Sequence, residues 1–163
     1  MKAVIAISNS KGGVGKTTTA IHLADALAEH HRTLLVDVDV QANASSIFLE
    51  GPVPAENSIY AALREKRPIA QLLHGTRRRN LDLVPATIHL AEIESLLSGA
   101  VDGFFRLSDS LKMQELPHEY VVIDCPPNLG MITVNAFVAA SHIIVPLQTA
   151  KFSVDGLAAL RET

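Results

Sequence analysis

Several residue types are scarce in this chain, and each scarcity excludes a class of protein. The 163 residues include no Trp, two Tyr and five Phe, so we expect an aliphatic core. The single Cys, Cys125, allows neither an intramolecular disulfide nor a cysteine-based zinc or iron–sulfur site within one chain. This cysteine usage favours a reduced, cytoplasmic protein.

Long apolar runs and an excess of positive charge are also missing. The first apolar run, Ala3–Ile7, is shorter than the h-region of a signal peptide, and no run approaches the roughly 18 apolar residues of a membrane span. We therefore expect no membrane partner. The 14 basic and 17 acidic side chains give a formal net charge of −3, so no global positive field attracts nucleic acid. An apolar content of 48% argues against intrinsic disorder.

Short apolar runs predict the fold class. Five of them are rich in β-branched residues and do not alternate with polar residues: Ala3–Ile7, Thr33–Val36, Leu81–Val84, Tyr120–Ile123 and His142–Val145. Such runs are typical of strands that are covered on both faces. Segments with helical spacing lie between them: Thr17–His30, Ile88–Leu97, Phe104–Leu116 and Met131–Ala140. We expect an α/β fold with three layers and a mostly parallel, doubly wound sheet, in one domain over residues 1–163.

The stretch Glu50–Arg79 is the least regular part of the chain. It contains a predicted short helix, Ser58–Arg64, capped by Ser58 or Asn57. Six basic residues lie between Arg64 and Arg79, and solvated surface is the favoured interpretation of such a charge cluster. Near the end of the chain, Ser153–Thr163 has the pattern of a beginning helix.

The segment Ser10–Thr18, with the sequence SKGGVGKTT, carries the strongest motif. It follows a predicted strand and opens a predicted helix, as a phosphate-binding loop (P-loop) does. Glycines let backbone N–H groups turn toward phosphate oxygens, and the helix N-terminus adds partial positive charge. Lys16 would reach the β- and γ-phosphates, and Thr17 would place its hydroxyl on Mg²⁺. We expect a P-loop NTPase fold in which the nucleotide contacts Gly12, Gly13, Val14, Gly15, Lys16, Thr17 and Thr18.

Two predicted strands end in carboxylates. Open α/β sheets bind ligands at the carboxyl ends of their strands, which is where Asp37, Asp39 and Asp124 lie. Asp37 and Asp39 are two residues apart, so an extended strand turns both to the same side, and close carboxylates need a cation or donor between them. Asp124 has the place of a Walker B aspartate that binds Mg²⁺ through water. A loop that uses its aspartates for turn capping is the alternative.

Taken together, these segments resemble the ParA/MinD family of ATPases, which have a deviant Walker A motif with an additional lysine. The resemblance rests on KGGVGKTT at Lys11–Thr18, on VDVDVQANAS at Val36–Ser45 and on DCPPNLG at Asp124–Gly130. It implies that Lys11 contacts the nucleotide of a partner subunit and that Asp39 positions or activates the hydrolytic water. The implied catalytic residues are Lys11, Lys16, Asp39 and Asp124, and those at Mg²⁺ are Thr17, Asp39 and Asp124.

The resemblance also implies a cellular role. A member of the ParA/Soj branch would be a Mg-ATP-dependent ATPase that forms a homodimer on ATP binding and partitions plasmids or chromosomes. Its partners would be non-specific DNA and a ParB-like adaptor, and it would be cytoplasmic, or nucleoid-associated when bound to DNA. Val40 and Ala42 stand where family members commonly have Pro and Gly, which affects the rigidity of the loop more than its ligands.

Two alternatives remain open at this stage. One is a MinD-like ATPase that positions the division site at the membrane, although Gln41–Ser45 fits the ParA branch better. The other is a non-catalytic nucleotide-binding module. Family members continue for several more strands and helices, so the resemblance predicts a C-terminally truncated domain that lacks the adenine pocket and the DNA-binding surface.

Overall fold

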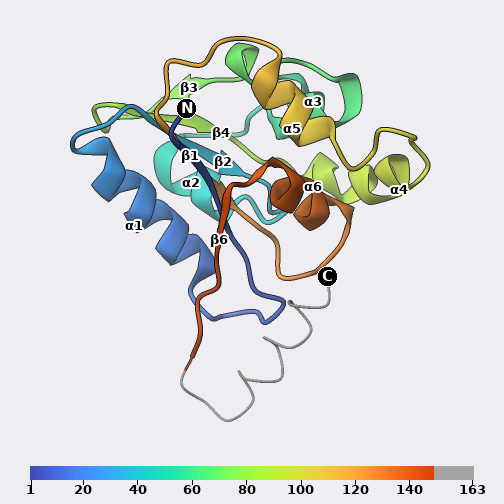
Figure 1. Cartoon of the computed structure of the whole chain (residues 1–163), viewed down its shortest axis with the longest axis horizontal. Coiled ribbons are helices and arrows are strands. Elements are labelled where there is room, and N and C mark those ends of the chain that lie inside the picture. The colour runs from blue at the N-terminus through green and yellow to red at the C-terminus, as the bar shows by residue number, and fades with distance from the viewer. Residues whose placement is uncertain (149–163) are drawn as a thin grey trace.

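The computed structural model describes residues 1–148, which contain a six-stranded sheet and helices on both of its faces (Figure 1). The strands are β1 (Ala3–Ile7), β2 (Thr33–Asp37), β3 (His74–Gly75), β4 (Leu81–Val84), β5 (Tyr120–Asp124) and β6 (His142–Ile144). The α-helices are α1 (Lys16–Ala28), α2 (Asn43–Phe48), α3 (Ile59–Glu65), α4 (Ile93–Ser98), α5 (Arg106–Lys112) and α6 (Met131–Ala139). Three 3₁₀ turns, η1 (Ala55–Asn57), η2 (Ile69–Gln71) and η3 (Ile88–Glu92), complete the described elements.

The order of the strands brings three loops to one edge of the sheet. The order is β3-β4-β2-β5-β1-β6, and all neighbours are parallel except β3 and β4. In the register of the central strands, Asp124 at the end of β5 pairs with Ile7 of β1 and with Asp37 of β2. The loops that follow β1, β2 and β5 therefore leave the sheet side by side.

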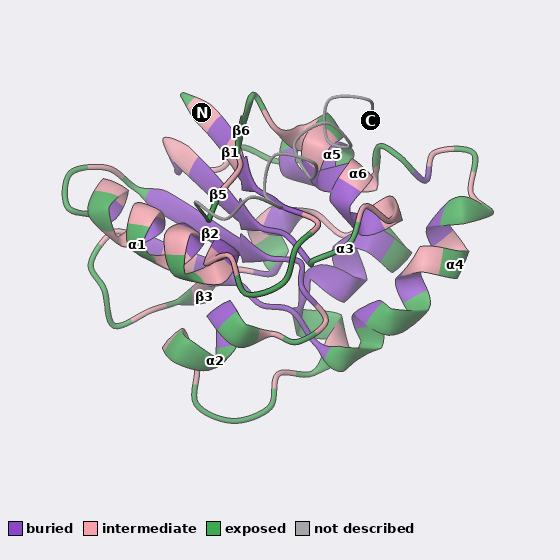
Figure 2. Ribbon diagram, turned by 90° about the horizontal axis from the view of Figure 1, so that it is seen from below, coloured by how far each residue is buried: buried purple, intermediate pink, exposed green. Residues whose placement is uncertain are grey.

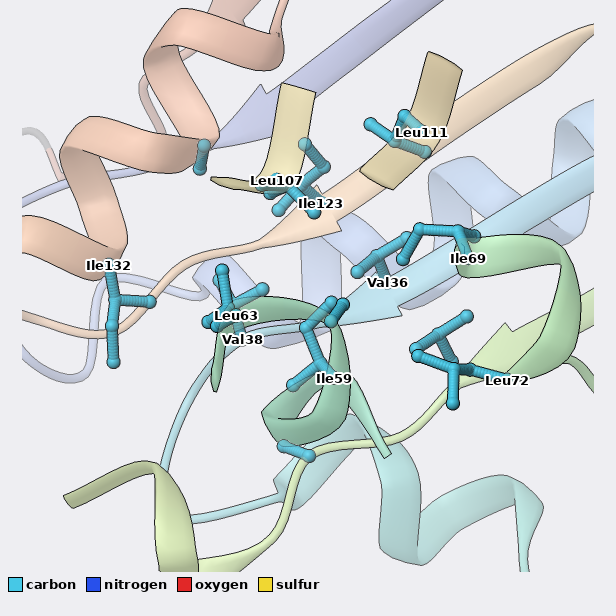
Figure 3. Packing of buried hydrophobic residues seen from close by; sticks show 14 of the residues in the cluster. Val36, Val38, Ile59, Leu63, Ile69, Leu72, Leu107, Leu111, Ile123 and Ile132 are labelled. Atoms are coloured by element: carbon cyan, nitrogen blue, oxygen red, sulfur yellow. The ribbon is translucent and has the colours of Figure 1, made fainter. Parts of the chain in front are cut away.

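Side chains alternate between two apolar layers because each strand turns successive residues to opposite faces. Leu35 and Val122 pack in the cluster that α1 covers, whereas Val36 and Ile123 pack in the larger cluster beneath α3 to α6. Figure 2 shows the strands as the buried centre between the helices, and Figure 3 shows this larger cluster from close by. The expected three-layer, mostly parallel sheet is confirmed.

Helix α1 differs from the prediction in the face that it buries. The sequence predicted a face formed by Ile21, Ala24, Leu27 and Ala28, but Ile21 and Leu27 are only half-buried. The buried face of α1 consists of residues at four-residue spacing: Lys16, Ala20, Ala24 and Ala28. Small alanine side chains let the helix backbone approach the sheet closely, and the same face carries Lys16 to the end of β1.

The other elements agree with the prediction in part. Helix α3 begins after Ser58, whose hydroxyl accepts a hydrogen bond from the Tyr60 amide, as predicted. The predicted helix Phe104–Leu116 begins only at Arg106, because residues 101–105 turn around Gly103, which packs directly on the Leu97 carbonyl. Residues Ile88–Leu97 divide into η3 and α4, and neither α2 nor β3 was predicted. The helix predicted at Ser153–Thr163 lies outside the described residues.

Candidate nucleotide-binding site

The predicted phosphate loop connects the end of β1 to the start of α1. Gly13 and Gly15 have φ angles of +72° and +89°, in the left-handed region that favours glycine. A Cβ atom at either position would meet nothing within 4 Å, so the backbone conformation, not space, requires glycine there. Gly15 is the N-cap of α1, and within the described residues no side chain caps this helix end. The first amides of α1 are thus available to an anion.

Lys16 and the neighbouring loop residues are held by several hydrogen bonds. The Lys16 side chain is 7% exposed, and its Nζ donates to the Lys11 carbonyl at 3.1 Å, which places the ammonium within the loop. The Asn9 Oδ1 accepts from the Lys11 amide at 2.9 Å, and the Gln148 Nε2 donates to the Gly13 carbonyl at 3.0 Å. Lys11 itself is exposed.

A hollow of about 380 Å³ opens at the carboxyl edge of the sheet. It brings together the phosphate loop, the loop after β2 and the loop after β5. The lining residues are Gly12, Gly13, Gly15, Lys16, Thr17, Thr18, Asp39, Gln41, Asn43 and Pro127. The structure therefore joins three of the segments that the sequence singled out into one concave site.

The Asp124 carboxylate lies near Lys16 and Thr17 and lacks hydrogen-bond partners among the described residues. The Asp124 side chain is fully buried, and neither carboxylate oxygen has a hydrogen-bond partner within residues 1–148. Burial, together with the charges of Asp37 and Asp39, raises the pKa of Asp124 to about 7. The Thr17 hydroxyl, which lies near the carboxylate without forming a hydrogen bond of good geometry, and the Lys16 ammonium oppose this rise. Buried polar atoms without partners are rare in folded proteins, so these two oxygens point to a missing ligand.

Asp37 is also fully buried, but its carboxylate is saturated with hydrogen bonds. It accepts from the Asp39 amide at 3.1 Å, from the Ser45 amide at 2.9 Å and from the Ser45 hydroxyl at 2.7 Å. Burial raises the pKa of Asp37 to about 6, and the bonds from Ser45 and Asp39 counteract the effect. For Asp37 the capping alternative is therefore the better account.

Asp39 has one oxygen engaged in its own loop. Its Oδ1 accepts from the Gln41 amide at 3.0 Å, and its carbonyl accepts from the Ala42 amide at 2.9 Å. The side chain is 6% exposed and borders the hollow. This geometry leaves the second carboxylate oxygen of Asp39 for the site.

The donor set fits a Mg²⁺ ion that is shared with a nucleotide. Mg²⁺ prefers oxygen ligands and commonly binds one or two carboxylates together with phosphates and waters. The two unpartnered oxygens of Asp124 and the Thr17 hydroxyl supply such ligands. In the described part of the chain, no group of three or more His, Cys, Asp or Glu side chains could hold a metal by itself. A cation here would therefore depend on ligands from the phosphates.

Two other features outside the loop bear on the assignment. Cys125 is fully buried, and burial raises the pKa of its thiol, as expected of a small apolar residue and not of a nucleophile. Among residues 1–148, no helix is both long and apolar enough to cross a membrane.

Most residues of the basic cluster between Arg64 and Arg79 form hydrogen bonds or salt bridges with neighbouring groups. The structure pairs Arg64 with the Tyr60 hydroxyl, Lys66 with Asp102, Arg67 with the Glu56 carbonyl, Arg77 with Glu50, and Arg78 with Asp25. These pairs support the interpretation of this cluster as solvated surface.

The residues that support the site carry no sequence signal of this role. Asn9, Gln148 and Ser45 are polar residues in loops or in a short helix, and no periodicity marks them. Asn9 directly precedes the segment Ser10–Thr18, and Gln148 follows a predicted strand. Only the fold brings Gln148 to Gly13, which is 135 residues away in the chain.

Comparison with known proteins identifies the family. Residues 2–163 match a family model described as AAA domain. The chain is 47% identical over 161 residues to the chromosome partitioning protein ParA of Myxococcus xanthus. It is 38% identical over 164 residues to the sporulation initiation inhibitor protein Soj of Bacillus subtilis. These matches cover 98% and 100% of this chain but 57% and 65% of the relatives, so the chain spans about three fifths of their length.

Solved structures agree with this assignment. A plasmid partition protein from Borrelia burgdorferi, bound to AMPPNP, matches with a TM-score of 0.90 and 32% identity over 98% of this chain and 68% of that one. The cobyrinic acid a,c-diamide synthase of Mycobacterium smegmatis, with a bound ATP analogue and magnesium, matches with a TM-score of 0.89 and 32% identity over 99% and 68%. The chain therefore belongs to the AAA domain family, in which the ParA and Soj partitioning proteins are among its relatives.

Proposed function

We propose that this chain is the nucleotide-binding part of a Mg-ATP-dependent ATPase that acts in plasmid or chromosome partitioning. The observation that carries the proposal is the buried Asp124 carboxylate, whose two oxygens have no partner within residues 1–148 and which lies near Lys16 and Thr17. A phosphate loop with left-handed glycines adjoins it. Structures of two relatives, at 32% identity each, hold AMPPNP or an ATP analogue with magnesium.

The roles of the residues follow from their chemistry. Amides of the loop and the Lys16 ammonium bind the phosphates and neutralise charge that develops on them. The Thr17 hydroxyl and the Asp124 carboxylate hold Mg²⁺, which supplies further charge stabilisation to the phosphates. The second carboxylate oxygen of Asp39 accepts a hydrogen bond from the water that attacks, and so orients that water.

The proposed function also includes assembly of two subunits and binding of DNA and an adaptor protein. Lys11 is exposed at the mouth of the loop, where it is available to the nucleotide of a second subunit. We propose that ATP binding drives homodimerisation through Lys11. The whole protein would then bind non-specific DNA and a ParB-like adaptor, and would be nucleoid-associated in that state. This part is supported by the identity to ParA of Myxococcus xanthus and to Soj.

Turnover of Mg·ATP by the wild-type chain and by Asp39→Asn tests the enzymatic part. General-base and water-positioning groups contribute about 10²–10⁴-fold to rates, so we expect at least a hundredfold loss of kcat with Mg·ATP affinity retained. Asp109→Asn, which changes an exposed aspartate, is the matched control. Binding without turnover in the wild type would favour the non-catalytic module instead. Unchanged turnover in Asp39→Asn would contradict the role of Asp39.

Sedimentation velocity tests the assembly. In the Asp39→Asn background, which preserves bound nucleotide, Mg·ATP should shift the chain from monomer to dimer, and Lys11→Ala should prevent the shift. A dimer that forms equally without nucleotide, or with Lys11→Ala, would contradict this step. For the whole protein, salt-sensitive retention on DNA should exceed retention on vesicles of anionic lipid, and the reverse would favour the MinD-like alternative.

A further inference from the structure

We infer that Asp37 and Ser45 are positioning residues, which hold the Asp39 loop in the geometry that hydrolysis needs. This inference rests on the proposed function, because it assigns a role to groups behind Asp39. Neither residue lines the hollow at the phosphate loop, whereas Lys16 does. They act through hydrogen bonds that connect the end of β2, the loop after it, the start of α2 and the end of β4.

The connection is continuous and buried. The Asp37 Oδ1 accepts from the Asp39 amide, and its Oδ2 accepts from both the amide and the hydroxyl of Ser45. The Ser45 Oγ in turn accepts from the Ala86 amide at 2.9 Å, immediately after β4. Asp37 is fully buried and Ser45 is 6% exposed, so water does not compete for these bonds. Hydrogen bonds to a buried carboxylate are stronger than neutral ones.

The local structure requires this help from Asp37. Helix α2 starts at Asn43, and its N-cap Ala42 has a φ of +51° and offers no side-chain cap. The Ser45 amide belongs to the first turn of α2, where amides have no partner within the helix. The Asp37 carboxylate satisfies this amide from outside the helix. Left-handed backbone is unfavourable for alanine, so the loop keeps this conformation only because such contacts fix it.

A carboxylate is the side chain that this arrangement calls for. All three groups that contact Asp37 are donors, so an amide in its place would set N–H against N–H or O–H. Asp37 lies close enough to Asp124 for its charge to raise the pKa of that carboxyl, which is a cost of placing carboxylates together. A merely space-filling residue would avoid that cost.

The effect of the connection falls on Asp39 and not on the phosphate loop. The Asp39 backbone is held at its amide by Asp37 and at its carbonyl by Ala42. The phosphate loop has separate anchors, the Asn9 and Gln148 side chains. Loss of the Ser45 hydroxyl should therefore disturb the placement of the attacking water while leaving the phosphate contacts in place.

Steady-state kinetics and calorimetry on three variants provide the test. Ser45→Ala removes the hydroxyl, and Ser45→Thr restores it with one added methyl at a residue that borders a separate hollow of about 330 Å³. Ser46→Ala is the matched control, because the hydroxyl of the exposed Ser46 bonds, among residues 1–148, only to the Asn43 carbonyl. A displacement near 1 Å can cost up to about 10²-fold in rate. We expect Ser45→Ala to lower kcat by about tenfold or more, with the Kd for Mg·ATP within about twofold of wild type.

The conservative variant and the double variant separate positioning from structural damage. Ser45→Thr and Ser46→Ala should keep nearly wild-type kcat. In the Asp39→Asn background, Ser45→Ala should cause no further loss, because its effect passes through Asp39. An equal loss in that background, or an equal weakening of Mg·ATP binding, would overturn the inference.

Amide hydrogen exchange supplies a readout that needs no turnover. In the wild type, the amides of Asp39 and Ser45 should exchange slowly, because both donate to the buried Asp37 carboxylate. Asp37→Asn should speed both while leaving the amide of Val122 in central strand β5 protected. If Asp37→Asn does not fold, Ser45→Ala takes its place, with faster exchange expected at Asp39. Unchanged exchange at Asp39 would overturn the inference, whereas a chain that shows these effects but no ATP turnover would refute only the proposed function.

Discussion

Replacing Asp124 by Asn should stabilise the chain in the absence of nucleotide and Mg²⁺, and the gain should grow with pH. Burial raises the pKa of Asp124 from its ordinary value of 3.8 to about 7. The folded chain therefore binds more protons than the unfolded chain between these two values. The free energy of unfolding falls as pH rises through that window. Asn carries no charge at any pH, so the variant escapes this loss.

The magnitude follows from the width of the window. Each unit of pKa difference corresponds to about 1.4 kcal/mol, so the shift of Asp124 costs the wild type about 4 kcal/mol at pH 8. At pH 5 most of this cost is absent, since the folded chain still holds the proton. The stability difference between Asp124→Asn and wild type should therefore increase by about 2–3 kcal/mol from pH 5 to pH 8.

Urea unfolding followed by far-ultraviolet circular dichroism measures this difference, because the chain has no Trp to serve as a fluorescent probe. The samples contain EDTA and no nucleotide, and the pH is varied from 5 to 8. Asp109→Asn, at an exposed aspartate, is the matched control. A difference for Asp124→Asn that is flat, or that falls with pH, would refute the idea that this carboxylate is buried without a partner.

Two further predictions concern the framework of the site. Gly15→Ala should destabilise the chain by about 1–2 kcal/mol because φ at Gly15 is +89°, whereas Gly12→Ala should change the free energy of unfolding by less than about 0.5 kcal/mol. Equal effects in urea unfolding would show that the left-handed backbone is not the cause. Glu94→Gln should cost about 1 kcal/mol, because the Glu94 carboxylate accepts from the Met131 amide at 2.6 Å and caps α6. The exposed Glu92→Gln should cost nothing measurable, and equal losses would contradict the capping role.

The sheet was predictable from the sequence because its strands are covered on both faces. Continuous apolar runs such as Tyr120–Ile123 have no other common explanation when helical segments separate them. The short strand β3 lacks that signal, since two residues at the edge of the sheet bury little. Helix α2 was missed for a related reason. Its six residues, NASSIF, are mostly polar or small, and the helix is held by the Asp37 carboxylate instead of by an apolar face.

The parts of the candidate site that are formed by contiguous sequence motifs were predictable. The glycine spacing around Lys16 and the carboxylates at the strand ends identified the loops that the fold then brought together. The different fates of Asp37 and Asp124 were not predictable, because both end a buried strand. What distinguishes them is the set of donors around each: Asp37 has three bonds from two residues, and Asp124 has none from the described residues. Such contacts depend on the packing of α2.

The most direct test of the central claim is a calorimetric titration of the chain with Mg·ATP, in parallel with Lys16→Ala and with Mg·GTP. We predict saturable binding of Mg·ATP by the wild type and its loss in Lys16→Ala, because the buried Lys16 ammonium lies within the phosphate loop. The Mg·GTP titration shows whether these residues also select the base. No heat of binding from the folded wild-type chain, or equal binding of Mg·ATP by Lys16→Ala, would contradict the assignment of this loop to nucleotide binding.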